Sequence, residues 1–354
     1  MKKLVVLCAC VFSFLLLNAQ TYKSFTSGKP WKDNKGVHLN AHGGGLLYLK
    51  GTYYWYGEHK VEGKEGNTAQ VGVHCYSSKD LYNWVDEGIA LKVSDDPHSD
   101  IQRGCILERP KVIYNKLTKK YVMWFHLELK GEGYASARAG IAIADKVAGP
   151  YTFIRSTRAT PGKYPVNVRD WSTNTEQLYV RDLEKGQMVR DQQLFVDDDG
   201  KAYHIFASED NQTLHIAELT DDYLDYTGKY VRVFEQRSME APAIFKKNGL
   251  YYFMGSGCTG WAPNEARSAV APSIWGPWTE LGNPCIGEGA EKTFFSQSTY
   301  ILPVQGKKDA YIYIGDRWTP NNPIDGQYIW LPIQFEENKF KIKWIDEWDL
   351  SYFR

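Results

Sequence analysis

The chain has 354 residues, with 42 Lys and Arg against 42 Asp and Glu, so its formal net charge is zero. Nucleic acids and anionic membrane surfaces attract proteins through a long-range positive field, and this balance argues against both as partners. The length suits one large domain or two small ones. The 12 Trp, 24 Tyr and 15 Phe residues fit either sugar-stacking rings or the aromatic core of an all-β fold.

The chain begins with a segment typical of a secretory signal. Two lysines follow Met1, an apolar stretch covers residues 4–17, and Ala19 offers a cleavage site after a small side chain. The stretch is short for a membrane span, and no cysteine marks a lipid anchor at the cleavage point. We predict a signal peptide over residues 1–19, a single mature domain over 20–354, and export to the periplasm or the extracellular space.

Four cysteines remain in the predicted mature chain: Cys75, Cys105, Cys258 and Cys285. They show no CxxC or Cys/His spacing typical of a metal site. Four cysteines allow three disulfide pairings, and the sequence does not choose between them. Burial as small apolar side chains is the alternative.

One strand phrase recurs five times: a turn, a tyrosine, and then alternating apolar residues. The copies are KGTYYWYG (50–57), KKYVMWFH (119–126), GKAYHIFA (200–207), NGLYYFMG (248–255) and KDAYIYIG (308–315). Each follows a shorter apolar run across a turn of Gly, Asn or Asp, which is typical of a β-hairpin. Further strands are indicated by DLYNWVDEG, VAGPYTFI and SIWGPWTEL. These repeats predict an all-β, five-bladed β-propeller; a β-sandwich would not repeat this phrase.

A polar residue stands at the start of each predicted inner strand. In chain order these residues are His42, Glu108, Asp191, Glu240 and Gln297. Inner strands of a propeller converge on its axis, so we expect these side chains to line one funnel.

Carboxylates across a funnel suit glycoside hydrolysis, in which one group protonates the leaving oxygen while water is activated on the opposite face of the sugar. A third carboxylate nearby raises the pKa of the acid by like-charge repulsion. Glu240 is the predicted acid, because the Ala241-Pro242 that follows favours an extended backbone. A structural carboxylate that accepts backbone N–H groups is the alternative for Glu240.

The phrases RDQQLFVDDDGKAYHIFAS and EAPAIFKKNGLYYFM make the chain resemble glycoside hydrolase family 43, whose members are inverting five-bladed propellers. The resemblance implies Glu240 as the general acid and Asp191 as the carboxylate that orients and modulates its pKa. The family usually places its base, an aspartate, just before the first YY phrase. The matching stretch here is AHGGG, residues 41–45, which holds no carboxylate.

The exo-β-1,3-galactanase branch of the family shares this departure, and the chain resembles it over nearly all of the predicted mature length. The shared phrases are AHG, YYWYGE, ERPKVI, MWFH, GWAPN, SQ, GDRW and YIW. In that branch the glutamine of SQ is proposed to help activate the water, which assigns Gln297 to the place of the missing base. A neutral amide is a very weak base, so Glu108 stays open as the proton acceptor. A buried amide that satisfies backbone groups is the alternative for Gln297.

The same resemblance implies six sugar-binding residues: Glu58, Tyr134, Thr259, Trp261, Asp316 and Trp318. Glu58 and Tyr134 would hold hydroxyls of the terminal sugar. Trp261 would offer a stacking face with Thr259 beside it. The Asp316–Trp318 segment would line the funnel, although an Asp-Arg pair at a strand end is equally often structural.

We predict no metal and no cofactor. His42, His126 and His204 lie in different predicted blades, without the paired spacing of metal ligands. The DDDG at residues 197–200 lacks the spacing of a calcium loop and is better explained as a hairpin turn.

Together these features predict an exported, monomeric, inverting glycoside hydrolase that releases galactose from a chain end of the β-1,3-galactan of arabinogalactan, a plant polysaccharide. An α-L-arabinofuranosidase or a β-D-galactofuranosidase of the same fold is the alternative, because small loop differences separate their pockets. A non-catalytic sugar-binding propeller is the alternative of another class. The three carboxylates Glu108, Asp191 and Glu240 argue against it, because a binding module needs no acid with a raised pKa.

Overall fold

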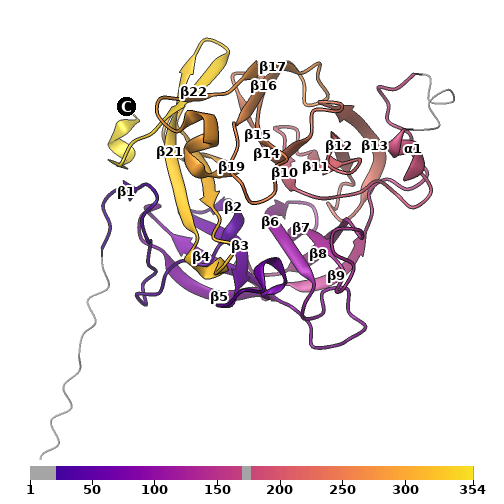
Figure 1. The fold of residues 1–354 in the computed structure, drawn as a ribbon, viewed down its shortest axis with the longest axis horizontal. Coiled ribbons are helices and arrows are strands. Elements are labelled where there is room, and N and C mark those ends of the chain that lie inside the picture. Colours follow the sequence, from indigo (N-terminus) through magenta and orange to yellow (C-terminus); the bar gives the residue numbers. More distant parts are fainter. Residues whose placement is uncertain (1–20, 170–176, 354) are drawn as a thin grey trace, which may run out of the picture.

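The computed structural model describes residues 21–169 and 177–353, so the predicted signal peptide lies outside the described residues. Five antiparallel blades surround a common centre (Figure 1). The inner strands β2, β6, β10, β14 and β19 lie nearest that centre, and each packs against the next around the ring. The all-β, five-bladed propeller expected from the repeated hairpin phrase is confirmed.

The blades follow one another along the chain, and four of them have four strands. Blade one is β2 (His42–Leu49), β3 (Thr52–Lys60), β4 (Gln70–Ser78) and β5 (Val85–Lys92). Blade two is β6 (Ile106–Asn115), β7 (Lys120–Glu128), β8 (Arg138–Ala144) and β9 (Thr152–Thr157). Blade three is β10 (Gln192–Val196), β11 (Ala202–Ser208), β12 (Thr213–Leu219) and β13 (Tyr226–Val233). Blade four is β14 (Met239–Lys247), β15 (Leu250–Gly257), β16 (Arg267–Ala271) and β17 (Thr279–Gly282).

Blade five gains a fifth strand, because β18 pairs in parallel with the outermost strand of the blade. Its strands are β19 (Gln297–Pro303), β20 (Tyr311–Arg317), β21 (Gln327–Glu336), β22 (Lys339–Lys343) and β18 (Cys285–Ile286). A separate two-stranded sheet joins the two ends of the described chain, β1 (Phe25–Thr26) with β23 (Glu347–Trp348).

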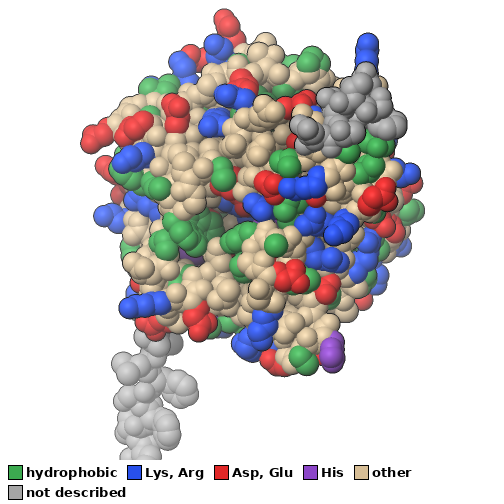
Figure 2. All heavy atoms as spheres, turned by 45° about the vertical axis from the view of Figure 1, so that its right-hand side comes forward, with side chains coloured by type: hydrophobic (Ala, Val, Ile, Leu, Met, Phe, Trp, Pro, Cys, Tyr) green, Lys and Arg blue, Asp and Glu red, His purple; other side chains and the backbone are tan. Residues whose placement is uncertain are grey.

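Helices are few and short in the described part of the chain, and none is long and apolar enough to cross a membrane. They are α1 (Leu178–Arg181) and the 3-10 turns η1 (Gly66–Thr68), η3 (Ala290–Phe295), η4 (Pro323–Asp325) and η5 (Leu350–Tyr352). Figure 2 shows acidic and basic side chains intermingled over one face, as the zero net charge implies.

The five repeated phrases form the second strand of each blade: β3, β7, β11, β15 and β20. Each of these strands pairs with the inner strand before it in antiparallel register. A blade is covered on both faces by its neighbours, so these strands are buried on both sides; every residue of β11 is buried.

Three inner strands carry a bulge directly after the polar residue near their start. The pairing register shifts there, and the second residue of each pair His42-Gly43, Glu108-Arg109 and Glu240-Ala241 has a positive φ, of 61°, 52° and 54°. A bulge bends the strand and re-aims the side chain before it. Glycine is required at position 43, because a Cβ there would lie 2.2 Å from Oε1 of Glu58.

Many of the aromatic side chains counted in the sequence are structural. Trp55, Trp84, Trp124 and Trp330 are almost completely buried. The rings of Phe25 and Trp348 lie 4.5 Å apart between centroids, so the two ends of the chain meet in this aromatic core.

Phe25→Ala tests the importance of this closure. Phe25 is 2% exposed, and truncation of a buried phenylalanine costs about 3–5 kcal/mol of unfolding free energy through lost contacts and the cavity left behind. We expect a clearly lower unfolding temperature for the mature protein. Leu117→Ala, at a side chain 73% exposed, is the control; an equal loss in both variants would contradict the closure.

Candidate active site

The inner strands deliver their polar residues to one central cavity of about 380 Å³. Among its lining residues are the four predicted catalytic residues: Glu108, Asp191, Glu240 and Gln297. Four predicted binding residues line it as well: Glu58, Tyr134, Trp261 and Trp318. The expectation of a shared funnel therefore holds for four blade starts. At the remaining blade start, in blade one, His42 is buried against Trp318, with ring centroids 5.0 Å apart, and does not line the cavity.

Arg109 lies at the centre of the site and is only 5% exposed. Its Nε forms a 2.7 Å ion pair with Asp191, and its Nη2 donates to Oε1 of Gln297 at 2.5 Å. Its Nη1 donates to the Ser298 carbonyl, and its backbone N–H donates to Oε1 of Glu58 at 2.9 Å. Burial opposes the charge of Arg109, but Asp191, together with Glu58 and Glu108, outweighs burial and raises the pKa of the guanidinium. One side chain thus joins blades two, three and five.

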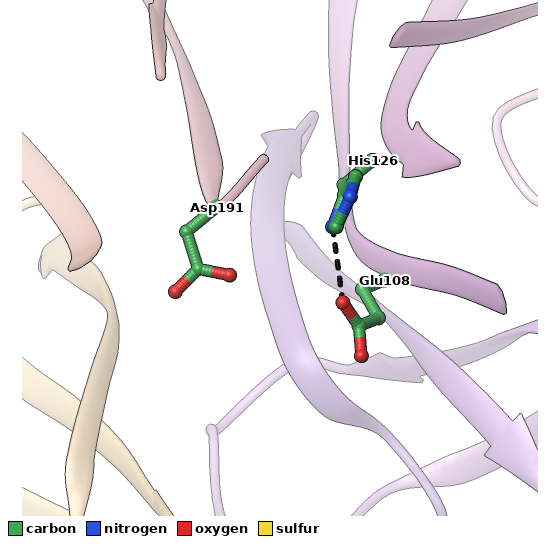
Figure 3. Close-up of side chains that lie close together, drawn as sticks. All are labelled: Glu108, His126 and Asp191. Atoms are coloured by element: carbon green, nitrogen blue, oxygen red, sulfur yellow. Dashed lines mark ion pairs between the residues drawn. The ribbon is translucent and has the colours of Figure 1, made fainter. Parts of the chain in front are cut away.

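Glu108 is held ionised by a buried histidine (Figure 3). Its Oε2 lies 3.0 Å from Nδ1 of His126. The Nε2 of the same histidine lies 2.8 Å from Glu128. Burial alone would lower the pKa of His126, but its hydrogen bonds to the two glutamates raise the pKa to about 9. Burial would likewise raise the pKa of Glu108, but the bond to His126 lowers it to about 2. Glu108 is therefore a weak proton acceptor.

Glu240 has the opposite electrostatic environment. Burial is the largest influence and the nearby negative charge of Asp191 is the next; together they raise the pKa of Glu240 to about 7. Asp191 also accepts the Ala241 backbone N–H at 2.9 Å, which fixes the bulge that aims Glu240. A half-buried carboxyl that keeps its proton near neutral pH suits a general acid.

The amide of Gln297 is fixed at both ends. Its Oε1 accepts from Arg109, and its Nε2 donates to Oγ of Ser256 at 2.9 Å. A carbonyl oxygen has two lone pairs, so one acceptor position of Oε1 remains for a water or a sugar hydroxyl.

The predicted hydroxyl-binding residues Glu58 and Tyr134 are anchored within the site. Glu58 is fully buried and forms a 2.8 Å ion pair with Lys60. Tyr134 is 40% exposed; its hydroxyl donates to Oε1 of Glu108 at 2.9 Å and accepts from Asn67. Tyr134 therefore presents a fixed oxygen beside Glu108, whereas Glu58 is held in the buried wall of the cavity.

An adjoining cavity of about 310 Å³ shares Trp261, Gln297 and Trp318 with the central cavity. The rings of Trp261, 45% exposed, and Trp318 form an edge-to-face pair at 5.9 Å, which gives the cavity mouth an aromatic wall suited to a sugar face.

Two predicted binding residues are placed differently. Asp316 lines the adjoining cavity, not the central one; it is 1% exposed, and its Oδ2 accepts the Gly43 N–H. Burial raises the pKa of Asp316 to about 7. Thr259 lines neither cavity, because its hydroxyl donates to the Ala262 carbonyl inside its own loop. The thiol that faces the central cavity belongs to the preceding residue, Cys258.

The disulfide question is answered for the described residues: Cys75, Cys105, Cys258 and Cys285 are all free, and only Cys258 is exposed. One described group has the residue types of a metal site, Glu108, His126 and Asp191, with ligand atoms within 4.8 Å of one another (Figure 3). The carboxylates of this group are already paired with Arg109 and His126, so the arrangement fits an ion-pair network better than a divalent cation.

A family model described as glycosyl hydrolases family 43 matches residues 45–299. The chain belongs to this family. It is therefore a glycoside hydrolase, and it acts with inversion of the anomeric centre. A curated relative, a β-D-galactofuranosidase from Aspergillus niger, is 30% identical over 264 residues, which are 72% of this chain and 69% of that protein.

Solved structures of the family superpose closely on this family 43 chain. A β-1,3-galactosidase solved with galactodeoxynojirimycin is 52% identical, with a TM-score of 0.88 over 92% of this chain and 100% of that one. An exo-β-1,3-galactanase from Clostridium thermocellum is 37% identical, with a TM-score of 0.78 over 92% of this chain and 66% of that one. An exo-β-1,3-galactanase from Phanerochaete chrysosporium, solved with β-1,3-galactotriose, is 32% identical, with a TM-score of 0.79 over 93% and 68%.

Sequence reasoning missed several residues of this site, among them Arg109, Asn211, Ser256 and Cys258. Arg109 carried a signal, because it directly follows the blade-start carboxylate Glu108 inside a motif of the family branch. Asn211 lies in a polar hairpin turn and resembles any turn residue, so its position carried none.

The raised pKa of Glu240 predicts the pH dependence of activity. Glu240 must hold its proton to act, so kcat/KM should fall as the pH rises through about 7. Asp191→Asn removes the like charge that helps raise this pKa, so the basic limb should move to lower pH. Initial rates between pH 4 and 9 measure the basic limb of wild type and of Asp191→Asn. An unmoved basic limb in Asp191→Asn would contradict the assignment of Glu240 as the acid.

Arg109→Met tests the central ion pair. The variant leaves Asp191 without its cation and Gln297 without its donor, so we expect kcat/KM to fall by at least about 100-fold. Loss of one partner of a buried pair also costs about 3–5 kcal/mol of unfolding free energy. Arg237→Met, at an exposed pair with Glu280, is the control and should change neither quantity. Near-normal activity in a folded Arg109→Met variant would show that the pair is dispensable.

Proposed function

We propose that this enzyme releases galactose from a chain end of β-1,3-galactan. Two observations support this proposal. The site keeps the acid Glu240 but has no carboxylate in the AHGGG stretch. Solved β-1,3-galactosidase and exo-β-1,3-galactanase structures superpose over more than nine tenths of the chain.

In the proposed mechanism Glu240 gives its proton to the glycosidic oxygen as the bond from that oxygen to the anomeric carbon breaks. Water, oriented by the free acceptor position of Gln297, forms the new bond from the opposite face. An oxygen bonded to the anomeric carbon that still carries both protons is a strong acid, so even the weakly basic Glu108 can accept one. Glu108 then ends protonated and Glu240 ionised, and exchange with solvent restores both.

The aromatic wall of Trp261 and Trp318 would stack on the apolar face of galactose. Glu58 and Tyr134 would bind its hydroxyls.

A β-D-galactofuranosidase is the second candidate, favoured by the 30% identity to the Aspergillus niger enzyme. The α-L-arabinofuranosidase remains as a further outcome of the substrate test. Hydrolysis of a synthetic aryl β-D-galactofuranoside or aryl α-L-arabinofuranoside, with no galactose from galactan, would assign the protein to one of these activities.

We further propose that the enzyme is exported and is a monomer. Its substrate would be the galactan backbone of arabinogalactan outside the cytoplasm. The N-terminal signal pattern over residues 1–19 supports export. Mass spectrometry of protein from an exporting host should give Gln20 as the first residue, and size-exclusion chromatography with light scattering should give one chain.

The function test compares galactose release from β-1,3-galactan by wild type and two variants. Wild type should release galactose whose first-formed anomer, seen by proton NMR, is α, because inversion converts a β-linkage. Glu240→Gln should lose about 100- to 10,000-fold, the usual contribution of general acid catalysis. Gln297→Ala should lose about 100-fold, whereas Gln334→Ala, at an exposed glutamine of β21, should retain full activity.

Azide distinguishes the proposed proton acceptor from the water-orienting residue. Azide needs no deprotonation, so it should restore turnover to Glu108→Gln and yield the α-galactosyl azide. No rescue in a folded Glu108→Gln variant would mean that Glu108 is not the base.

A further inference from the structure

The two oxygens of the Glu240 carboxyl have unequal surroundings. Nδ2 of Asn211 donates to Oε1 at 2.8 Å, and the thiol of Cys258 donates to the same oxygen at 3.2 Å. Within the described part of the chain, no hydrogen bond reaches Oε2. The two donors come from different blades: Asn211 lies in blade three, and Cys258 directly follows β15, the second strand of blade four.

Asn211 is held in place by a strained and well-anchored turn. The turn between β11 and β12 contains three consecutive residues, 209–211, with φ of 52°, 55° and 67°. Such a run persists only where the surroundings enforce it. Here the buried carboxylate of Glu209 accepts from Arg232 at 2.6 and 2.8 Å and from His215 at 2.8 Å. Asparagine tolerates the left-handed conformation better than most residues.

Cys258 is positioned by a clamp at the end of β15. The side chain of Asn264 accepts from the Gly257 N–H at 2.7 Å and donates to the Gly257 carbonyl at 3.0 Å. Nδ2 of Asn264 also donates to the hydroxyl oxygen of Thr259 at 2.7 Å. Both neighbours of Cys258 are thus fixed, and its thiol lines the central cavity beside Glu240.

We propose that Asn211 and Cys258 are positioning residues that keep the proton of Glu240 on Oε2. Two donors aimed at Oε1 stabilise the form in which Oε1 is the carbonyl oxygen and Oε2 carries the proton. Only a proton on the oxygen that the donors leave free is available for transfer to the glycosidic oxygen. The inference rests on the proposed role of Glu240 as the acid.

Neutral donors suit this task better than charged ones. The charges that influence Glu240 are those of Asp191 and Glu108, which raise its pKa, and Arg109, which lowers it. A lysine or arginine in place of the two donors would add a second positive charge beside Arg109, lower the pKa of Glu240 and ionise the acid. The amide of Asn211 does not titrate. Burial and the adjacent Glu240 raise the pKa of Cys258 to about 11, so the thiol remains a donor at neutral pH.

The test compares two β-galactosides whose leaving groups differ in their need for an acid. β-1,3-Galactobiose has a poor leaving group that must be protonated, whereas 2,4-dinitrophenyl β-D-galactopyranoside has one that leaves unaided. The variants are Asn211→Gly and Cys258→Ala; glycine is chosen at position 211 because it tolerates the positive φ. For both variants we expect kcat on galactobiose to fall by about 10-fold or more. Activity on the dinitrophenyl substrate should change by less than about 2-fold. The ratio of the two rates does not depend on the fraction of folded enzyme.

The pH profile gives an independent readout. A hydrogen bond donated to the ionised carboxylate lowers its pKa, so removal of a donor should raise the pKa of Glu240. The basic limb of kcat/KM should therefore move to higher pH in Asn211→Gly and Cys258→Ala. Cys258→Ser keeps a donor and should leave the limb in place.

Glu240→Gln separates failure of this inference from failure of the proposed function. If Glu240→Gln loses activity on galactobiose alone, while Asn211→Gly and Cys258→Ala lose both substrates equally, the two residues are structural and the inference is overturned. If Glu240→Gln still hydrolyses galactobiose at the wild-type rate, Glu240 is not the acid and this inference loses its premise, whereas a wild type that releases no galactose from galactobiose overturns the proposed function.

Discussion

The site depends on one buried cation, the guanidinium of Arg109. It is the point at which Asp191, Gln297 and the backbone of blade five are tied to blade two. A guanidinium has five donors in a fixed plane, so it can hold several acceptors from different strands in one arrangement. Without that charge, Asp191 would be a poorly compensated carboxylate beside Glu240 and Glu108. The five blades bring the groups near one another, and Arg109 fixes their orientation.

Around this cation, one cavity holds carboxyl groups in different protonation states. His126 keeps Glu108 ionised, with a pKa near 2, whereas burial and Asp191 hold the pKa of Glu240 near 7. The difference arises from the surroundings of each carboxyl group: His126 lies beside Glu108, whereas burial and the charge of Asp191 act on Glu240. Glycoside hydrolysis with inversion requires such a division, because one side of the sugar must receive a proton while the other loses one.

The three glycines of the stretch that lacks the usual base, residues 43–45, are closely packed. A Cβ at Gly43 would meet Glu58, one at Gly44 would meet Trp55 at 2.4 Å, and one at Gly45 would meet Lys111 at 2.4 Å. The backbone of blade one therefore lies directly against neighbouring side chains at these three glycines. The fixed amide of Gln297 and the ionised Glu108 are what the cavity offers instead.

The sequence by itself determined the fold and the first layer of the site. Strand alternation and turn chemistry are local properties, so the five hairpin phrases predicted the blades. The regular position of polar residues at the blade starts predicted Glu108, Asp191, Glu240 and Gln297. The tertiary structure alone decided which groups support them: Arg109 and Asn211 act across blades, whereas His126 and Cys258 act from the second strand, or directly after it, of the same blade. The packing of distant strands sets their distances and burial, and therefore their pKa values, and no local pattern in the chain encodes these quantities.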